Sequence, residues 1–267
     1  MAVEATDMIF FLSANRPEND TDISGGAIDS TMRLLDRTNT ESINDQIDLV
    51  SSAAGDTQNC VVAGYAPDGT WLEETVALNG VSHVQTVGTF LHLRKVQLAS
   101  AAVGTITVAK YAAGVPVTIF TIPITEKGQV TLFLKAAAEA VGGASKNFYE
   151  KVFLQNTHAT DALINAVLWM SEDENAQLTL DCEESANVTV TNGTETTTNR
   201  VTEPTTGGTY AWGEHATQGT AHACGDAEDG NLAASERQGT WIKMTLAAGA
   251  APDKSVFVTM NEYGEAT

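Results

Sequence analysis

Short runs of alternating apolar and polar residues, separated by turn-forming residues, constrain this chain to β-structure. The run 70–78 (TWLEETVAL) alternates with period two, and a Pro-Asp-Gly turn at 67–69 precedes it. An Asn-Gly turn follows at 79–80, and both turns use residues that suit the backbone of tight hairpins. The chain also holds 35 threonines, whose β-branched side chains fit a pleated surface. The sequence therefore predicts an all-β protein.

Similar strand patterns recur along the chain at a spacing typical of a β-sandwich or barrel. Residues 1–40 lack a sustained period and are expected to form an extended N-terminal arm, ordered only where it docks on something. Residues 41–125 and 126–267 are each expected to form a β-sandwich domain, of jelly-roll or immunoglobulin-like type. The second domain includes a polar excursion at 192–235, and such a long connection usually carries an interaction surface or a mobile segment.

Acidic side chains outnumber basic ones by 34 to 14, which gives the 267 residues a formal charge of −20. This charge repels phosphate backbones and anionic lipid headgroups, so neither nucleic acid nor a membrane is expected as a partner. No run of about 18 apolar residues occurs, and acidic residues stand in 1–11 where a signal peptide carries basic ones. Three cysteines (Cys60, Cys182 and Cys224) argue against a disulfide framework and fit a reducing cytoplasm.

The negative charge is unevenly distributed along the sequence. Residues 160–267 hold 4 basic and 17 acidic side chains, a net charge of −13, whereas 126–159 hold 4 basic and 3 acidic ones, a net charge of +1. The lysines of the second span are Lys127, Lys135, Lys146 and Lys151. One interpretation is simple solubility; the other is that 126–159 docks on an acidic partner while the C-terminal part faces solvent.

Motifs for nucleotide and hydrolase chemistry are missing from the sequence. No GxxxxGK[ST] loop, no GxSxG elbow and no HExxH helix occurs, and the five histidines lie in five different local settings. We therefore predict no catalytic residue, no cofactor and no enzymatic activity. Paired carboxylates for glycoside hydrolysis stay open, because 34 acidic residues offer many pairs whose separation a sequence does not give.

Two stretches of the polar excursion contain residue types that bind metals. His215, His222 and Cys224 lie within ten residues, and imidazole and thiolate both suit zinc. Their spacing matches no standard site, and long polar loops collect such residues by chance. The acidic run 172–174 (EDE) is interpreted in the same way, as a solvated turn between strands.

The second stretch resembles the start of a calcium loop. In 226–231 (DAEDGN), Asp226, Glu228 and Asp229 could converge on a cation, but Arg237 stands where a closing bidentate glutamate is needed. We predict no metal site, with Asp226, Glu228, Asp229, His222 and Cys224 as weak candidates.

Aromatic residues make up 6% of the chain, so few are present to stack on a sugar. Three tryptophans (Trp71, Trp169 and Trp241) fall in predicted strands and are expected in the core. Trp212 lies inside the polar excursion and is the better candidate for a contact residue, with Tyr210 and Tyr263 as further exposed aromatics.

Three consecutive segments resemble a part of tailed-phage virion structural proteins: residues 51–80 (SSAAGDTQNCVVAGYAPDGTWLEETVALNG), 84–98 (VQTVGTFLHLRKVQL) and 102–108 (AVGTITV). In those proteins an AADTQ-like run, a hairpin, an ETVTLNG-like strand and a strand ending in GTITV follow one another. Residues 239–251 (GTWIKMTLAAGAA), with 156–173 before them, are similar to the second half of such proteins. Cys60 and Ala63 depart from the pattern, which has Thr or Val there.

The resemblance implies a non-enzymatic virion structural protein, and it brings no catalytic residues. The first expectation is a capsid decoration or cement protein that binds the major capsid protein, other virion proteins and further copies of itself as a homo-oligomer. Such a protein is located in the virion, which is assembled in the host cytoplasm. The alternatives are a tail, neck or fibre component of the virion, and a carbohydrate-binding β-sandwich module.

Overall fold

Almost all regular structure in the chain is β-strand, which confirms the all-β prediction. The computed structural model describes residues 2–37, 39–135, 143–172, 178–184, 193–204, 212, 215, 217–225, 229–249 and 258–266. Within these ranges there are seventeen strands, and the helical elements are the single 3₁₀ turns η1 (Ala5–Asp7) and η3 (Gln218–Thr220). No helix in these ranges has the length and apolar character needed to cross a membrane.

The chain divides into two compact units, which we call unit 1 and unit 2. Unit 1 comprises Met1–Asp29 and Phe133–Thr267, and unit 2 comprises Ser30–Leu132. One strand, β2 (Gly25–Leu34), begins in unit 1 and ends in unit 2. The predicted boundaries at 40 and 125 are therefore corrected, because unit 1 is built from both ends of the chain.

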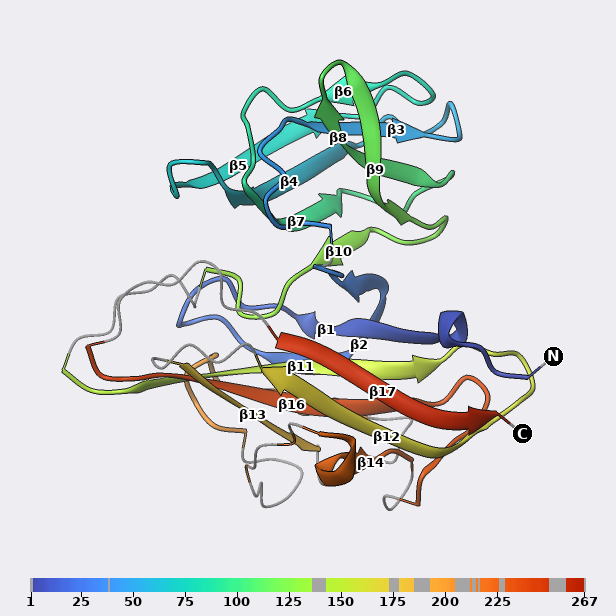
Figure 1. The fold of residues 1–267 in the computed structure, drawn as a ribbon, viewed down its shortest axis with the longest axis vertical. Helices are drawn as coiled ribbons and strands as arrows, with labels where there is room; N and C mark the ends of the chain where they lie inside the picture. The colour runs from blue at the N-terminus through green and yellow to red at the C-terminus, as the bar shows by residue number, and fades with distance from the viewer. Residues whose placement is uncertain are drawn as a thin grey trace. The chain divides into compact units, whose positions relative to one another are not determined.

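Unit 2 is a sandwich of two sheets (Figure 1). Its strands are β3 (Ile47–Ser51), β4 (Asn59–Tyr65), β5 (Trp71–Ala77), β6 (Val84–Gln85), β7 (His92–Leu98), β8 (Ile106–Ala112), β9 (Val115–Ile122) and β10 (Gly128–Val130). One sheet has the order β10-β7-β4-β5, with the end of β2 beside β10, and the other has the order β6-β3-β8-β9. Apolar side chains at alternate positions of both sheets form one core; its fully buried members include Ile47, Val62, Phe90, Val96 and Val108.

Unit 1 is also built from two sheets. Its strands, beside β2, are β1 (Met8–Asn15), β11 (Lys146–Asn156), β12 (Leu163–Glu172), β13 (Leu178–Glu184), β14 (His222–Ala223), β15 (Asn231–Leu232), β16 (Arg237–Leu246) and β17 (Val258–Ala266). Its larger sheet is the part β13-β16-β11-β1-β2 of a nine-stranded sheet that continues through β10, and the smaller one joins β14, β12 and β15, with β17 also paired to β12. Figure 1 shows β12 and β17 side by side, in yellow and red. The prediction of two β-sandwiches therefore agrees with the observed strand pairing, in which each unit contains strands of two sheets.

The expected N-terminal arm is corrected by the pairing of β1. Residues Met8–Leu12 pair antiparallel with β11, from Met8 opposite Asn156 to Leu12 opposite Val152. Phe11 and Leu12 are buried, so this segment is part of a sandwich core. The sequence did not predict this because the run Phe10–Leu12 is too short to show a period, and its partner strand lies more than a hundred residues away.

Candidate functional site

The candidate zinc ligands do not form a metal centre. The rings of His215 and His222 lie with their centroids 3.7 Å apart and their planes tilted by 51°, and Nδ1 of His215 lies 2.7 Å from the carbonyl oxygen of Thr220. Cys224 is fully buried in the apolar core of unit 1, beside residues such as Leu168. Among the described residues, no three His, Cys, Asp or Glu side chains are grouped closely enough to hold a metal ion.

The calcium-like stretch is described only in part. Asp226 and Glu228 lie outside the described residues, as does most of the acidic run 172–174. Asp229 accepts a hydrogen bond from the backbone N–H of Asn231 at 2.8 Å. This is the local turn bond that an aspartate commonly makes, so the carboxylate of Asp229 stabilises its own loop.

Three of the four lysines that made 126–159 the positive part of the sequence form ion pairs within unit 1. The side chain of Lys151 is 0% exposed and forms an ion pair with Glu195. Lys146 pairs with Asp20, and Lys135 lies 3.3 Å from Glu18. These three lysines therefore offer less unpaired charge to an acidic partner than the sequence suggests, since their carboxylate partners come from distant parts of the sequence.

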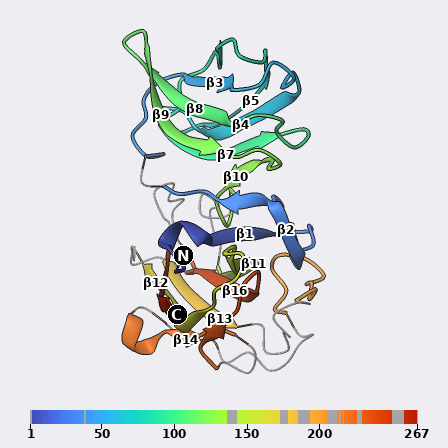
Figure 2. The same cartoon turned by 90° about the vertical axis from the view of Figure 1, so that its right-hand side faces the viewer.

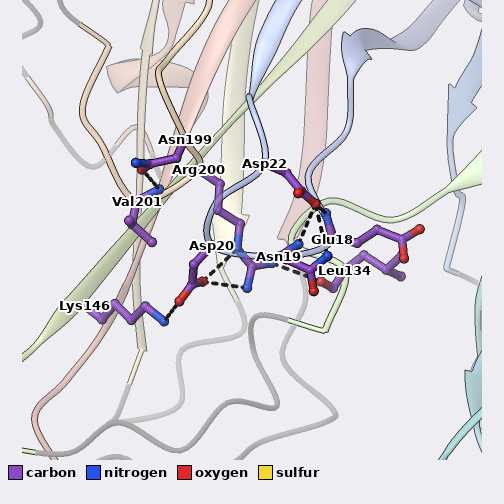
Figure 3. Close-up of polar contacts among 9 residues, drawn as sticks. All are labelled: Glu18, Asn19, Asp20, Asp22, Leu134, Lys146, Asn199, Arg200 and Val201. Atoms are coloured by element: carbon purple, nitrogen blue, oxygen red, sulfur yellow. Dashed lines mark hydrogen bonds and ion pairs between the residues drawn. The ribbon is translucent and has the colours of Figure 1, made fainter.

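Figure 3 shows how Asp20 lies between two cations. Its carboxylate accepts hydrogen bonds from Nε and Nη2 of Arg200 at 3.1 and 3.0 Å and pairs with Lys146 on the other side. Burial raises the pKa of Asp20, but the hydrogen bonds and charges of Lys146 and Arg200 outweigh burial and hold it below its ordinary value. The Arg200 side chain is 1% exposed, and it also donates to the carbonyl of Leu134 at 3.3 Å.

These ion pairs fix the first described part of the polar excursion, 193–204, to the sheet of unit 1. The backbone N–H of Tyr149 donates to the carbonyl of Arg200 at 2.8 Å, and that of Thr197 donates to Ser24 at 2.9 Å. A segment held by buried charges and backbone hydrogen bonds is a structural element. The excursion was predicted as one long interaction or mobile segment, and 193–204 does not fit that description.

Trp212 is also engaged within unit 1. Its ring centroid lies 5.4 Å from that of Tyr149, and Nζ of Lys243 lies 5.1 Å from the Trp212 ring centroid. Its indole N–H donates to Glu203, so the ring has partners on several sides. Of the three tryptophans predicted in the core, Trp241 is fully buried, whereas Trp71 and Trp169 are only half-buried. Tyr263 is 41% exposed, and Tyr210 is outside the described residues.

Unit 2 instead carries two uncharged exposed surfaces, of which the first is organised by Asp56. We define the Asp56 platform as residues 52–55, 79–82 and 99–104, three loops that contain no charged side chain. Asp56 is fully buried beneath them and accepts hydrogen bonds from the backbone N–H groups of Val103 and Gly104 at 2.9 and 2.8 Å.

Further hydrogen bonds to Asp56 hold the loops of the platform together. The Asp56 carboxylate also accepts a hydrogen bond from the hydroxyl of Ser51, and its carbonyl accepts from the N–H of Gly80 at 2.8 Å. Burial raises the pKa of Asp56, but the bonds from Ser51, Val103 and Gly104 hold it below its ordinary value. The platform therefore presents Val81 and Val103, 60% and 66% exposed, on rigid loops.

The second surface is the end of the β8–β9 hairpin, which we call the hairpin tip and define as residues 113–118. Ala113 and Gly114 have φ of 51° and 86°, and two successive positive φ values define the type I′ turn of a two-residue hairpin loop. All six residues are exposed, and Val115 and Val117 expose 63% and 46% of their area.

The charge of −20 also divides unequally between the units. Unit 2 contains 6 basic and 9 acidic side chains, a formal charge of −3, whereas unit 1 contains 8 and 25, a formal charge of −17. Unit 2 thus carries both of these uncharged surfaces and only −3 of the net charge of −20.

Sequence reasoning did not single out either surface. The platform falls only partly within the segments that carry the phage resemblance, because 81–82 and 99–101 lie outside them, and the absence of charge from its loops was a usable signal. For the tip, the signal was the uncharged stretch 111–125 around an Ala-Gly turn. No family model, curated protein or solved structure matches the chain. The geometry of these surfaces therefore supplies the functional argument.

Proposed function

We propose that this chain is a non-enzymatic structural protein of a tailed-phage virion, in which it binds the major capsid shell as a decoration or cement protein. The observation that carries the proposal is the unequal charge of the units, −3 in unit 2 and −17 in unit 1. In this proposal unit 2 contacts the shell through an uncharged surface, and unit 1 keeps its acidic side chains in solvent.

The electrostatics support this assignment of roles. Many copies on one lattice repel one another through like charges, and the cost is smallest where the contact surface carries little charge. A strongly acidic part that remains in water also opposes aggregation of the decorated particles. Exposed valines on rigid backbone supply apolar area for the contact without a large ordering cost.

The buried charges of unit 1 support a structural role. Lys151, Glu195 and Arg200 are side-chain types that catalysis often uses, but here they attach 193–204 to the sheet.

The test is quantitative mass spectrometry of purified particles encoded by the same genome as this chain. The proposal predicts a copy number that scales with the number of capsid subunits. A copy number that fits a single vertex would favour a neck or tail component, and absence from the particles would refute a virion role. Binding on a glycan array with no particle association would favour the carbohydrate-binding alternative.

A further inference from the structure

We infer that the hairpin tip is the element that inserts into the shell, with Val115 and Val117 entering an uncharged apolar pocket on the coat protein. This inference rests on the proposed function and names the contact residues and the chemistry of their partner. The partner is a protein surface, concave and apolar, because the tip is a narrow projection without charge.

The tip projects because the β8–β9 hairpin extends beyond the end of β3, the strand that pairs with β8. The last residue of β8 that pairs with β3 is Lys110, opposite Ile47, and the N–H of Tyr111 donates to the carbonyl of Gln46. Beyond this point β8 and β9 continue alone, and no atom lies within 4 Å of a Cβ built on Gly114. Figure 2 shows the hairpin in green, extending past β3 and β4 of the same unit.

The composition of the projection is unusual for a solvent-exposed hairpin. Residues 111–125 contain no charged side chain, although 18% of the chain is charged. Val115 and Val117 are two residues apart on one strand, so their side chains lie on the same face of β9. Two exposed valines on one face of a projection offer a small apolar area to a protein partner.

The edge of β9 is not built to receive another strand. Because the N–H of Tyr111 points toward β3, its pairing partner Pro116 has its nitrogen directed at the free edge of β9. Proline lacks the N–H that an added strand requires there. A register shift between Val108 and Ala109 further disrupts the ladder. The contact is therefore made by side chains at the tip.

The residue types at the tip also select against other partners. Residues 111–125 offer no lysine or arginine to a phosphate. The nearest aromatic side chains, Tyr111 and Phe120, are half-buried, so no exposed aromatic ring is available to stack on a sugar. Tip insertion into an apolar protein pocket uses the valines, and the type I′ turn keeps the ordering cost low.

The experiment compares two double variants with the wild-type protein. The tip variant combines Val115→Asp with Val117→Asp, and the matched control combines Val81→Asp with Val103→Asp on the Asp56 platform. All four valines are exposed, so both variants add the same charge without disturbing the core. Thermal unfolding verifies that both fold.

Epitope-tagged copies of each protein are co-expressed with the untagged chain during particle assembly, and the tag is quantified in purified particles. We expect incorporation of the tip variant to fall at least ~100-fold, since two buried valines are lost and two charges enter an apolar pocket. The platform control should incorporate within about threefold of wild type, a difference of less than 1 kcal/mol.

The outcomes separate the two proposals. If tagged wild-type protein is absent from particles, the proposed function fails and the inference fails with it. If wild type is present but the tip variant incorporates equally well, or the platform control falls by the same factor, only the inference is overturned. Flotation of the purified protein with phosphatidylcholine vesicles, lost in the tip variant, would also overturn it, because the tip would then bind a membrane.

Discussion

The carboxylate of Asp56 accepts a hydrogen bond at 2.8 Å from the backbone N–H of Gly104, which lies 48 residues further along the chain. This bond joins the loop after β3 to the loop before β8, and its neighbour from Val103 does the same. A buried carboxylate that accepts several N–H and O–H donors replaces water for all of them. The end of the unit 2 sandwich is therefore organised around one side chain.

Replacement of this side chain should destabilise unit 2. In Asp56→Asn the amide NH₂ group faces N–H donors, so at least one buried donor loses its acceptor. We expect the free energy of unfolding to fall by about 2–4 kcal/mol, measured by urea denaturation. A matched control is Asp68→Asn, whose exposed turn bonds to Thr70 contribute less. Equal losses in both variants would show that burial of Asp56 adds nothing.

A second prediction concerns Glu150, which is buried on β11 in unit 1. Burial raises the pKa of its carboxyl from 4.5 to about 8, against the opposing effects of a Phe133 backbone hydrogen bond and the charges of Arg200 and Arg16. Its Oε1 atom has no hydrogen-bond partner among the described residues. The folded protein therefore holds this group in its neutral form at pH 7.

The sign of the pH effect follows from this raised pKa. Below pH 4.5 both the folded and unfolded states bind the proton, so the group imposes no penalty. As pH rises to about 8, the unfolded state ionises first and stability falls by a few kcal/mol. Glu150→Gln should reduce this loss, as measured by unfolding at pH 5 and pH 8. An unchanged pH dependence in the variant would contradict the assignment.

Strand content was predictable for unit 2 because its pairings are local. The alternating run 70–78 became β5, and the turn before it joins β4 and β5 as a hairpin, with Tyr65 opposite Trp71. Unit 1 was not predictable in the same way. Its larger sheet pairs Met8 with Asn156, two residues far apart in the sequence. The buried Lys151 likewise pairs with Glu195, a residue that no local sequence pattern identifies as its partner. A count of charges along the sequence does not distinguish a lysine in an ion pair from a lysine whose charge is available on the surface.

A third prediction tests the turn at the hairpin tip. Ala113 has φ of 51°, a conformation that costs an alanine about 1–2 kcal/mol, whereas asparagine adopts it readily. Ala113→Asn should therefore raise the free energy of unfolding by about 0.5–1 kcal/mol, and Gly114→Ala should lower it. Thermal melts of both variants give the measurement. Destabilisation by Ala113→Asn would argue against a type I′ turn.

The ion pair between Lys151 and Glu195 provides the last prediction. The Lys151 side chain is fully buried, with Nζ 5.1 and 5.7 Å from the ring centroids of Phe153 and Trp241, and burial lowers its pKa. Lys151→Met removes the buried cation that pairs with the largely buried Glu195 carboxylate, so the free energy of unfolding should fall by about 3–5 kcal/mol.

The double variant Lys151→Met with Glu195→Gln removes both charges and should recover most of this loss, because no unpaired charge remains. Urea denaturation of the wild type, both single variants and the double variant completes the cycle. Limited proteolysis provides a second measurement, since 193–204 should become cleavable in Lys151→Met and stay protected in the double variant. If the double variant is as unstable as Lys151→Met, packing of the lysine stem, and not its charge, holds this segment to the sheet.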